Sequence, residues 1–100
     1  MKHERNVIAV DFDETLTLGG RWWIEGEECI PNFKMIEWIN KKYRLGSVII
    51  IHSARPWECA RETVAWLIKY NVRYHGLYLN KLGADEYWDD KAHNIKEIIK

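Results

Sequence analysis

Cysteine, proline and long apolar runs are all scarce in this 100-residue chain. Its two cysteines, Cys29 and Cys59, lie in unrelated contexts without the close spacing of a zinc site, so we interpret them as ordinary reduced residues rather than a disulfide framework. No apolar run approaches the roughly 20 residues that cross a bilayer, and residues 1–6 lack the apolar segment of a signal peptide. These absences predict a cytoplasmic protein with no membrane partner.

The chain also lacks an excess of charge of either sign. Its 15 Lys and Arg residues balance 15 Asp and Glu residues, and the two signs are interspersed. This balance argues against a general nucleic-acid surface, although a specific nucleic-acid end could still be a substrate. The length predicts a single domain over residues 1–100, whose core must come from a few apolar runs and six tryptophans.

What the chain does contain is a concentration of negative charge at the end of an apolar run. Residues 7–10 predict a buried strand, and Asp11 and Asp13 follow it at once. In an extended chain alternate residues share a face, so we expect both carboxylates to point the same way while Phe12 points inward. Two carboxylates in one small volume repel unless a proton or a cation such as Mg²⁺ lies between them. A strand that ends in a polar turn is the plain alternative.

Two further clusters of polar side chains follow along the chain. Ser53 comes shortly after the apolar run 48–51, and Lys81 precedes an acidic pair, Asp89 and Asp90. These residues follow Asp-Phe-Asp-Glu-Thr at residues 11–15. Together the four groups resemble the four motifs of the haloacid dehalogenase superfamily of phosphotransferases, both in their order and in their position after predicted strands. The resemblance spans almost the whole chain. It is strongest to small phosphatases without a cap domain, including those associated with capsular polysaccharide synthesis.

The resemblance implies a role for each carboxylate. Asp11 would be the nucleophile that attacks phosphorus, since a carboxylate is ionised at neutral pH and needs no separate base. Asp13 would protonate the leaving oxygen and later take a proton from the attacking water. Asp11, the main-chain carbonyl of Asp13, and Asp89 with its neighbour Asp90 would form the metal site. The cofactor that the resemblance implies is Mg²⁺.

The same resemblance assigns the phosphate-binding groups. The Ser53 hydroxyl and the backbone N–H of Ala54 would hydrogen-bond the transferring phosphoryl group, and Lys81 would add a positive charge. Taken singly, a serine after a strand is more often a turn residue, and a lysine on a loop is more often only solvated. Thr15 is expected to steady the turn by bonding its side chain to the backbone.

Two departures from the common pattern bear on the expected site. Glu14 stands where many members of the superfamily have glycine, although members with glutamate there also exist. Neither gap between the motifs can hold a cap domain, since only a short flap over about residues 16–30 follows the first motif. The predicted site is therefore open, and a second copy of the chain in a homo-oligomer could cover it.

Three residues near the expected open site are candidates for contact with substrate. Trp22 and Trp23 could stack on a sugar or a base or form an oligomer contact, while packing of one of them beneath the flap is equally favoured. Arg55 could bind a second anionic group of the substrate or form a salt bridge that supports its loop. Transfer through a carboxylate needs no histidine, so structural or exposed positions are expected for His52, His75 and His93.

The remaining pattern predicts an α/β fold. One helix is expected between Pro31 and Gly46 and another after Pro56. Their apolar stripes would be Phe33, Ile36, Ile39 and Tyr43 in the first, and Trp57, Ala60, Val64, Leu67 and Ile68 in the second. Short strands near 77–79 and 86–88 and a closing helix over 92–99 complete the pattern. The alternation predicts a three-layer, doubly wound, Rossmann-like sandwich with a mainly parallel sheet and ligands at the carboxyl ends of its strands.

The sequence thus predicts a Mg²⁺-dependent phosphomonoester hydrolase that acts through an aspartyl-phosphate on a sugar phosphate or similar small substrate. A polynucleotide-end or nucleotide phosphatase is the alternative enzyme, which an open site with two tryptophans would also suit. A receiver-like signalling domain is disfavoured because its phosphorylated aspartate normally follows the third strand. A silent binding module is disfavoured because the residues of all four motifs are present.

Overall fold

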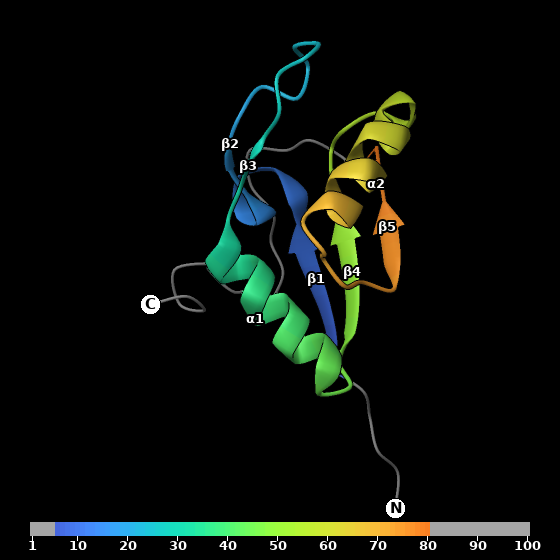
Figure 1. Cartoon of the computed structure of the whole chain (residues 1–100). Helices are drawn as coiled ribbons and strands as arrows, with labels where there is room; N and C mark the ends of the chain where they lie inside the picture. The colour runs from blue at the N-terminus through green and yellow to red at the C-terminus, as the bar shows by residue number, and fades with distance from the viewer. Residues whose placement is uncertain (1–5, 81–100) are drawn as a thin grey trace, which may run out of the picture.

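Three strands of the described chain form a parallel sheet with the order β1-β4-β5 (Figure 1). They are β1 (Val7–Asp11), β4 (Val48–His52) and β5 (Gly76–Tyr78). This computed structural model describes residues 6–80; residues 1–5 and 81–100 lie outside the described part. The expected strand near 86–88 and helix over 92–99 therefore lie outside the described residues, whereas the other three expected strands are confirmed.

The central strand β4 fixes the register of the whole sheet. Its run of branched aliphatic residues favours extended backbone, and Ile49 and Ile51 are completely buried. β1 pairs with β4 so that Asp11 lies opposite His52, and β5 pairs on the other side so that His52 lies opposite Tyr78. Parallel pairing in this register brings the carboxyl ends of all three strands to one edge of the sheet.

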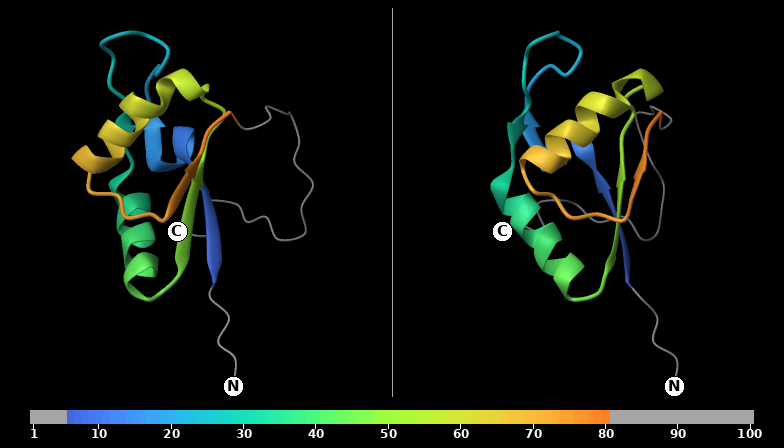
Figure 2. Two further views of the ribbon diagram at one scale, coloured as in Figure 1. Left: turned by 90° about the vertical axis from the view of Figure 1, so that its right-hand side faces the viewer. Right: turned by 45° about the vertical axis from the view of Figure 1, so that its right-hand side comes forward.

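Two helices, α1 (Phe33–Arg44) and α2 (Ala60–Lys69), connect the strands and lie on the same face of the sheet (Figure 2). Asn32 begins α1, because its Oδ1 accepts a hydrogen bond from the Met35 N–H at 3.2 Å. After Pro56, the short turn η2 (Trp57–Cys59) leads into α2. The described chain is thus an α/β fold with a parallel sheet. In residues 6–80, neither helix has the length and apolar character needed to span a membrane.

The core lies between the sheet and this helical layer. Ile49 and Ile51 from β4, Ile39 from α1 and Leu67 from α2 are all fully buried in one cluster. Burying one such side chain contributes about 1.5–3 kcal/mol. Packing of the helices against β4 therefore holds the strand ends in a fixed arrangement.

The apolar faces of the two helices differ in part from those that the sequence predicts. In α1, Phe33 is exposed and Met35 is buried. Ile68 is exposed within α2, and Trp57 is exposed in the turn just before it. The buried side chains of α2 are Thr63, Trp66 and Leu67. The predicted stripes were wrong at these positions because Trp57 belongs to the separate turn η2, and Ile68 lies a step of about 100° around the helix from Leu67.

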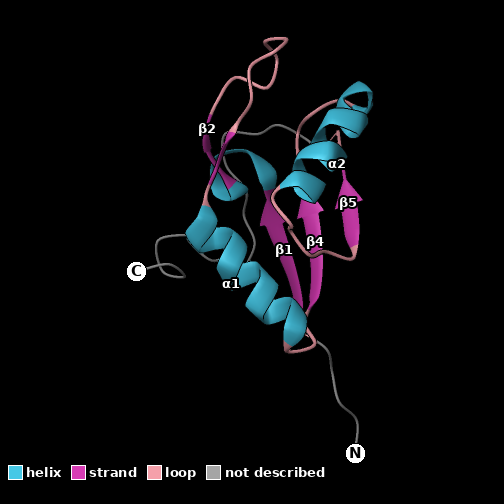
Figure 3. Cartoon of the chain, in the orientation of Figure 1, coloured by secondary structure: helices cyan, strands magenta, loops and turns pink. Residues whose placement is uncertain are grey.

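The flap expected over about residues 16–30 is an antiparallel hairpin. The wide turn η1 (Phe12–Leu16) leads from β1 into β2 (Thr17–Gly19), which pairs with β3 (Ile30–Pro31). Gly20 has φ +115°, and a Cβ atom there would lie 2.7 Å from the Cys29 Cα, so this close crossing of the two arms requires glycine. Figure 3 shows the flap projecting beyond the carboxyl ends of the strands.

Candidate functional site

The carboxyl ends of β1 and β4 place the first two motifs side by side. Asp11 is the last residue of β1, and its Oδ1 lies 3.5 Å from Nδ1 of His52, the last residue of β4. The side chain of Asp11 is 49% exposed at this edge. Ser53 follows His52, and its N–H donates to the Tyr78 carbonyl at 2.9 Å. The site is therefore built on three adjacent strand ends.

Asp13 is held from the other side by a buried arginine. Arg55 Nη2 donates to Asp13 Oδ1 at 2.8 Å, and Arg55 Nε donates to Asp13 Oδ2 at 3.0 Å. Ser53 Oγ also donates to Asp13 Oδ2, at 3.3 Å. The two carboxylates that the sequence predicts to share a face each have a basic neighbour of their own, Asp11 with His52 and Asp13 with Arg55.

Arg55 is only 5% exposed and is surrounded by partners. Its Nη1 donates to Thr63 Oγ1 at 3.1 Å, and its Nη2 also donates to Cys29 Sγ at 3.4 Å. The guanidinium carbon lies 4.5 Å from the ring centre of Phe12 and 5.2 Å from that of Trp22. Of the two interpretations of Arg55, this arrangement corresponds to the salt bridge that supports the loop.

Ser53 is engaged within the same network. It is 2% exposed, and its Oγ accepts the Arg55 N–H at 3.1 Å while donating to Asp13. Ala54, the other predicted phosphate-binding residue after β4, is exposed in the loop between them. A hydroxyl rotates readily, so Ser53 can exchange the Asp13 carboxylate for another hydrogen-bond acceptor.

The turn after β1 is steadied by residues other than the one expected. Glu14 has φ +62°, a conformation unfavourable for a residue with a side chain, and its N–H donates to Thr17 Oγ1 at 2.9 Å. Asn32 Nδ2 donates to the Thr15 carbonyl at 3.0 Å. The side-chain role predicted for Thr15 therefore belongs to Thr17, since η1 continues one residue beyond the motif and Thr17 follows it as the first residue of β2.

The two tryptophans of the flap have different environments. Trp22 is partly buried against the core, whereas Trp23 is 62% exposed, and their rings meet edge to face at 5.8 Å. The tip of the flap is closed by Arg21, whose Nη2 donates to Glu27 Oε1 at 2.7 Å and whose N–H donates to Glu27 Oε2. Trp22 thus packs beneath the flap, and Trp23 presents its ring to solvent.

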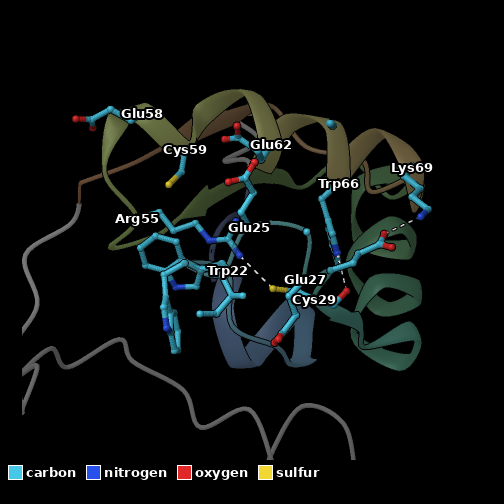
Figure 4. Close-up of a pocket in the computed structure, with 15 residues that line it drawn as sticks. Trp22, Glu25, Glu27, Cys29, Arg55, Glu58, Cys59, Glu62, Trp66 and Lys69 are labelled. Carbon is cyan, nitrogen blue, oxygen red and sulfur yellow. Dashed lines mark hydrogen bonds and ion pairs between the residues drawn. The ribbon is translucent and has the colours of Figure 1, made fainter.

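A groove of about 730 Å³ lies between the flap and α2, beside Arg55 (Figure 4). Trp22 and Cys29 line it from the flap, and Trp66 lines it from α2. The indole N–H of Trp66 donates to the Cys29 carbonyl at 2.9 Å and ties the base of the flap to the helix. Because Arg55 lines this groove and also binds Asp13, the groove adjoins the strand-end site.

Several pKa values around the groove are shifted by these contacts. Burial raises the pKa of the Cys29 thiol, and the Arg55 guanidinium opposes that rise only in part. Hydrogen bonds from Lys69 and Tyr70 lower the pKa of the Glu28 carboxyl. Hydrogen bonds from the Arg21 side chain and N–H lower the pKa of Glu27. The thiol is therefore held neutral near pH 7, and both carboxylates are held ionised.

The metal site implied by the resemblance is only partly within the described chain. Among residues 6–80, no group of three or more His, Cys, Asp and Glu side chains could hold a metal ion. Asp89, Asp90 and the predicted phosphate ligand Lys81 lie outside the described residues. The part that is described supplies the Asp11 carboxylate and the Asp13 carbonyl, hard oxygen donors that suit Mg²⁺, which binds through one or two carboxylates and keeps several waters.

Sequence reasoning missed several residues that the site uses. Thr63 and Cys29 both contact the Arg55 guanidinium, and His52 lies beside Asp11 although it was expected to have only a structural or exposed position. Nothing in the local sequence marks Cys29 or Thr63, because each reaches Arg55 only through the packing of the flap and α2. The position of His52 directly before Ser53 was a usable signal, since in-register parallel pairing sets it opposite Asp11.

No family model matches the chain, and no curated protein matches it. Among solved structures, it is similar to the crystal structure of a structural-genomics target from Vibrio cholerae. The two chains have 23% sequence identity and a TM-score of 0.75, over 94% of this chain and 87% of the other. A likeness at this level of identity supports the α/β fold and carries no activity with it.

Proposed function

We propose that this chain is a phosphomonoester hydrolase of the haloacid dehalogenase type, in which Asp11 forms an aspartyl-phosphate. The observation that carries the proposal is the 3.3 Å hydrogen bond from Ser53 Oγ to Asp13 Oδ2, which joins groups 40 residues apart at neighbouring strand ends. Ligands of parallel α/β sheets bind at this edge. The fold that goes with the proposal is a three-layer, doubly wound sandwich without a cap domain.

Asp11 is the residue suited to attack phosphorus. Its half-exposed carboxylate ends β1 at the open edge of the sheet, where a phosphate can approach in line. One carboxylate oxygen would form a bond to phosphorus while the bond from phosphorus to the leaving oxygen breaks. Water would then attack the aspartyl-phosphate and release inorganic phosphate and free Asp11.

Asp13 is suited to the proton transfers, with a constraint set by Arg55. Both of its oxygens accept hydrogen bonds, so taking a proton from the attacking water would also displace part of this arrangement. Protonating the leaving oxygen requires a protonated carboxyl, which must release at least one bond from Arg55 or Ser53. The pairing of Asp13 with Arg55 would therefore rearrange during each turnover.

Three groups outside residues 6–80 complete the proposal. Asp11, the Asp13 carbonyl and Asp89 or Asp90 would hold Mg²⁺, which when bound offsets the repulsion between the Asp11 carboxylate and the anionic phosphate. Lys81 would contribute a positive charge to the phosphoryl group, together with the Ser53 hydroxyl and the Ala54 N–H. A small phosphomonoester is favoured over a polynucleotide end because the groove beside Asp13 is acidic and would repel a polyanion.

Phosphate release from a panel of sugar phosphates, nucleotides and phosphorylated oligonucleotide ends tests this function, with Mg²⁺ or with a chelator. We expect Mg²⁺-dependent release from at least one small phosphomonoester, and we expect Asp11→Asn to lower kcat by at least about 1,000-fold because it removes the nucleophile. Glu37→Gln on the exposed side of α1 makes a similar change of charge and is the matched control.

Other outcomes would replace the proposal. Release that is unchanged in Asp11→Asn would show that another residue is the nucleophile. Stable labelling of Asp11 by a small phosphodonor without turnover would indicate a receiver-like domain. No release and no labelling with any member of the panel would indicate a binding module.

A further inference from the structure

The groove between the flap and α2 carries a strong excess of negative charge in a chain whose net charge is zero. Only two cationic side chains, Arg55 and Lys69, are found among the described residues that line it. The acidic lining residues are Glu25, Glu27, Glu28, Glu58 and Glu62. Five carboxylates against two cations give this groove a formal charge of −3, so it repels anions and attracts cations.

Both cations of the lining are already paired, and so are two of the five glutamates. Lys69 lies 2.7 Å from Glu28, Arg55 binds Asp13, and Glu27 binds Arg21 outside the groove. Of the carboxylates that line the groove, those of Glu25, Glu58 and Glu62 form no ion pair with another residue of 6–80. These three carboxylates are therefore available to a ligand.

The walls of the groove suit a cation with an attached apolar skeleton. Trp22, partly buried on the flap, and Trp66, 7% exposed on α2, are both among the residues that line it. Figure 4 shows Glu25 extending from the flap toward α2, the helix that carries Glu62. Carboxylates combined with an aromatic wall are the groups that recognise a protonated amine, through ion pairing and through attraction to the ring face.

The groove and the strand-end site share one residue, so the two adjoin. The Arg55 guanidinium binds Asp13 and at the same time lies 5.2 Å from the Trp22 ring centre. We propose that this groove receives the leaving group of the phosphomonoester and that the leaving group carries a protonated amine. This inference rests on the proposed function and specifies its substrate class: phosphomonoesters of amino alcohols, amino sugars among them.

Three sugar phosphates that differ at one position form the test. Glucosamine 6-phosphate carries the amine, glucose 6-phosphate has a hydroxyl there, and N-acetylglucosamine 6-phosphate has a neutral amide. At a pH below the pKa of the amine, we expect kcat/KM for the amine to exceed that of both neutral sugars by about tenfold, the size of one partly exposed cation contact.

Removing charge from the groove should remove this preference. The double variant Glu25→Gln with Glu62→Gln alters two exposed residues whose side chains form no hydrogen bond or ion pair within residues 6–80, and it should reduce the preference to about threefold or less. Glu37→Gln on α1 is the control and should keep the full preference.

The outcomes separate this inference from the function on which it rests. Release of phosphate at equal rates from all three sugars overturns the amine inference alone. In Asp11→Asn, tryptophan fluorescence measures binding of the same sugars without turnover, and tighter binding of glucosamine 6-phosphate supports the groove assignment. Equal binding overturns it, and absence of phosphate release from every substrate overturns the phosphatase itself.

Discussion

Arg55 is a buried cation whose hydrogen-bonding groups are satisfied from three parts of the chain. Asp13 follows β1, Cys29 lies at the base of the flap, and Thr63 lies on α2. The planar guanidinium can serve all three because its donors point in different directions within one plane. A lysine at this position would keep the charge and lose the paired geometry.

We expect Arg55→Lys to lower the free energy of unfolding by about 1.5–3 kcal/mol, the size of lost hydrogen bonds to a charged group. Urea denaturation followed by tryptophan fluorescence measures this change. Arg61→Lys is the matched control, because Arg61 is exposed on α2, and its effect should stay within about 0.5 kcal/mol. An equally small effect at Arg55 would mean that the buried pair with Asp13 contributes nothing to stability.

Glu14 shows how one backbone angle can explain a preference in a motif. Its φ of +62° is a conformation that glycine adopts easily. In the superfamily that the motif resembles, glycine is common at this position. Glu14 is accommodated here because its N–H bonds to Thr17 Oγ1 and because Asn32 holds the neighbouring Thr15 carbonyl. The departure at residue 14 is thus a local strain that neighbouring hydrogen bonds offset.

At the scale of elements, the flap is held by two separate contacts. At its base, Trp66 on α2 donates to the Cys29 carbonyl, in a buried position. At its tip, the Arg21 guanidinium and N–H bind the Glu27 carboxylate in a more exposed position. Acid can therefore break the contact at the tip by protonating Glu27. The contact at the foot of the flap joins an indole N–H to a backbone carbonyl, and neither group titrates.

Acid should loosen the tip of the flap. The Arg21 hydrogen bonds lower the pKa of Glu27 below its ordinary 4.5, so the pairing is fully present above pH 4.5 and is lost as pH falls through the lowered value. The Arg21 amide signal in NMR should shift as the pH is lowered through this range. Glu27→Gln should remove that shift and Glu25→Gln should keep it, while a shift that survives in Glu27→Gln would contradict this assignment.

The helices illustrate which parts of an element a sequence can define. The period of apolar residues predicted both helices, and Asn32 before α1 and Pro56 before η2 lie where such residues commonly begin a helix. The buried face of α2 was predicted less well, because Thr63 is buried by its bonds to Arg55 and the Cys59 carbonyl rather than by apolar character. A polar residue that is satisfied by tertiary contacts gives no hydrophobic signal.

At the scale of the whole molecule, a net charge of zero conceals an uneven distribution. Acids and bases balance over 100 residues, yet the groove beside the candidate site carries a formal charge of −3. The overall balance argues against a broad basic surface and says nothing about a local field. The local field is created by folding, which brings the glutamates of residues 25–28 against those of residues 58 and 62.

Salt should therefore weaken recognition of the amine. Raising ionic strength from about 0.01 M to about 1 M shortens the screening length from about 30 Å to about 3 Å. The ratio of kcat/KM for glucosamine 6-phosphate to that for glucose 6-phosphate should fall by about threefold over this range. Both substrates carry the same phosphate, so the effect of salt on phosphate binding cancels in this ratio. A ratio that stays constant as salt is added would show that the preference is not electrostatic.

The sequence by itself determined the local order of this protein. Strand and helix periods, and the positions of Asp11 and Ser53 at strand ends, follow from residues that are neighbours along the chain. Only the tertiary structure decided that Arg55 binds Asp13, 42 residues away, and Cys29, 26 residues away. The groove between the flap and α2 was decided in the same way, because contacts between distant segments depend on how the helices pack on the sheet, which no local pattern specifies.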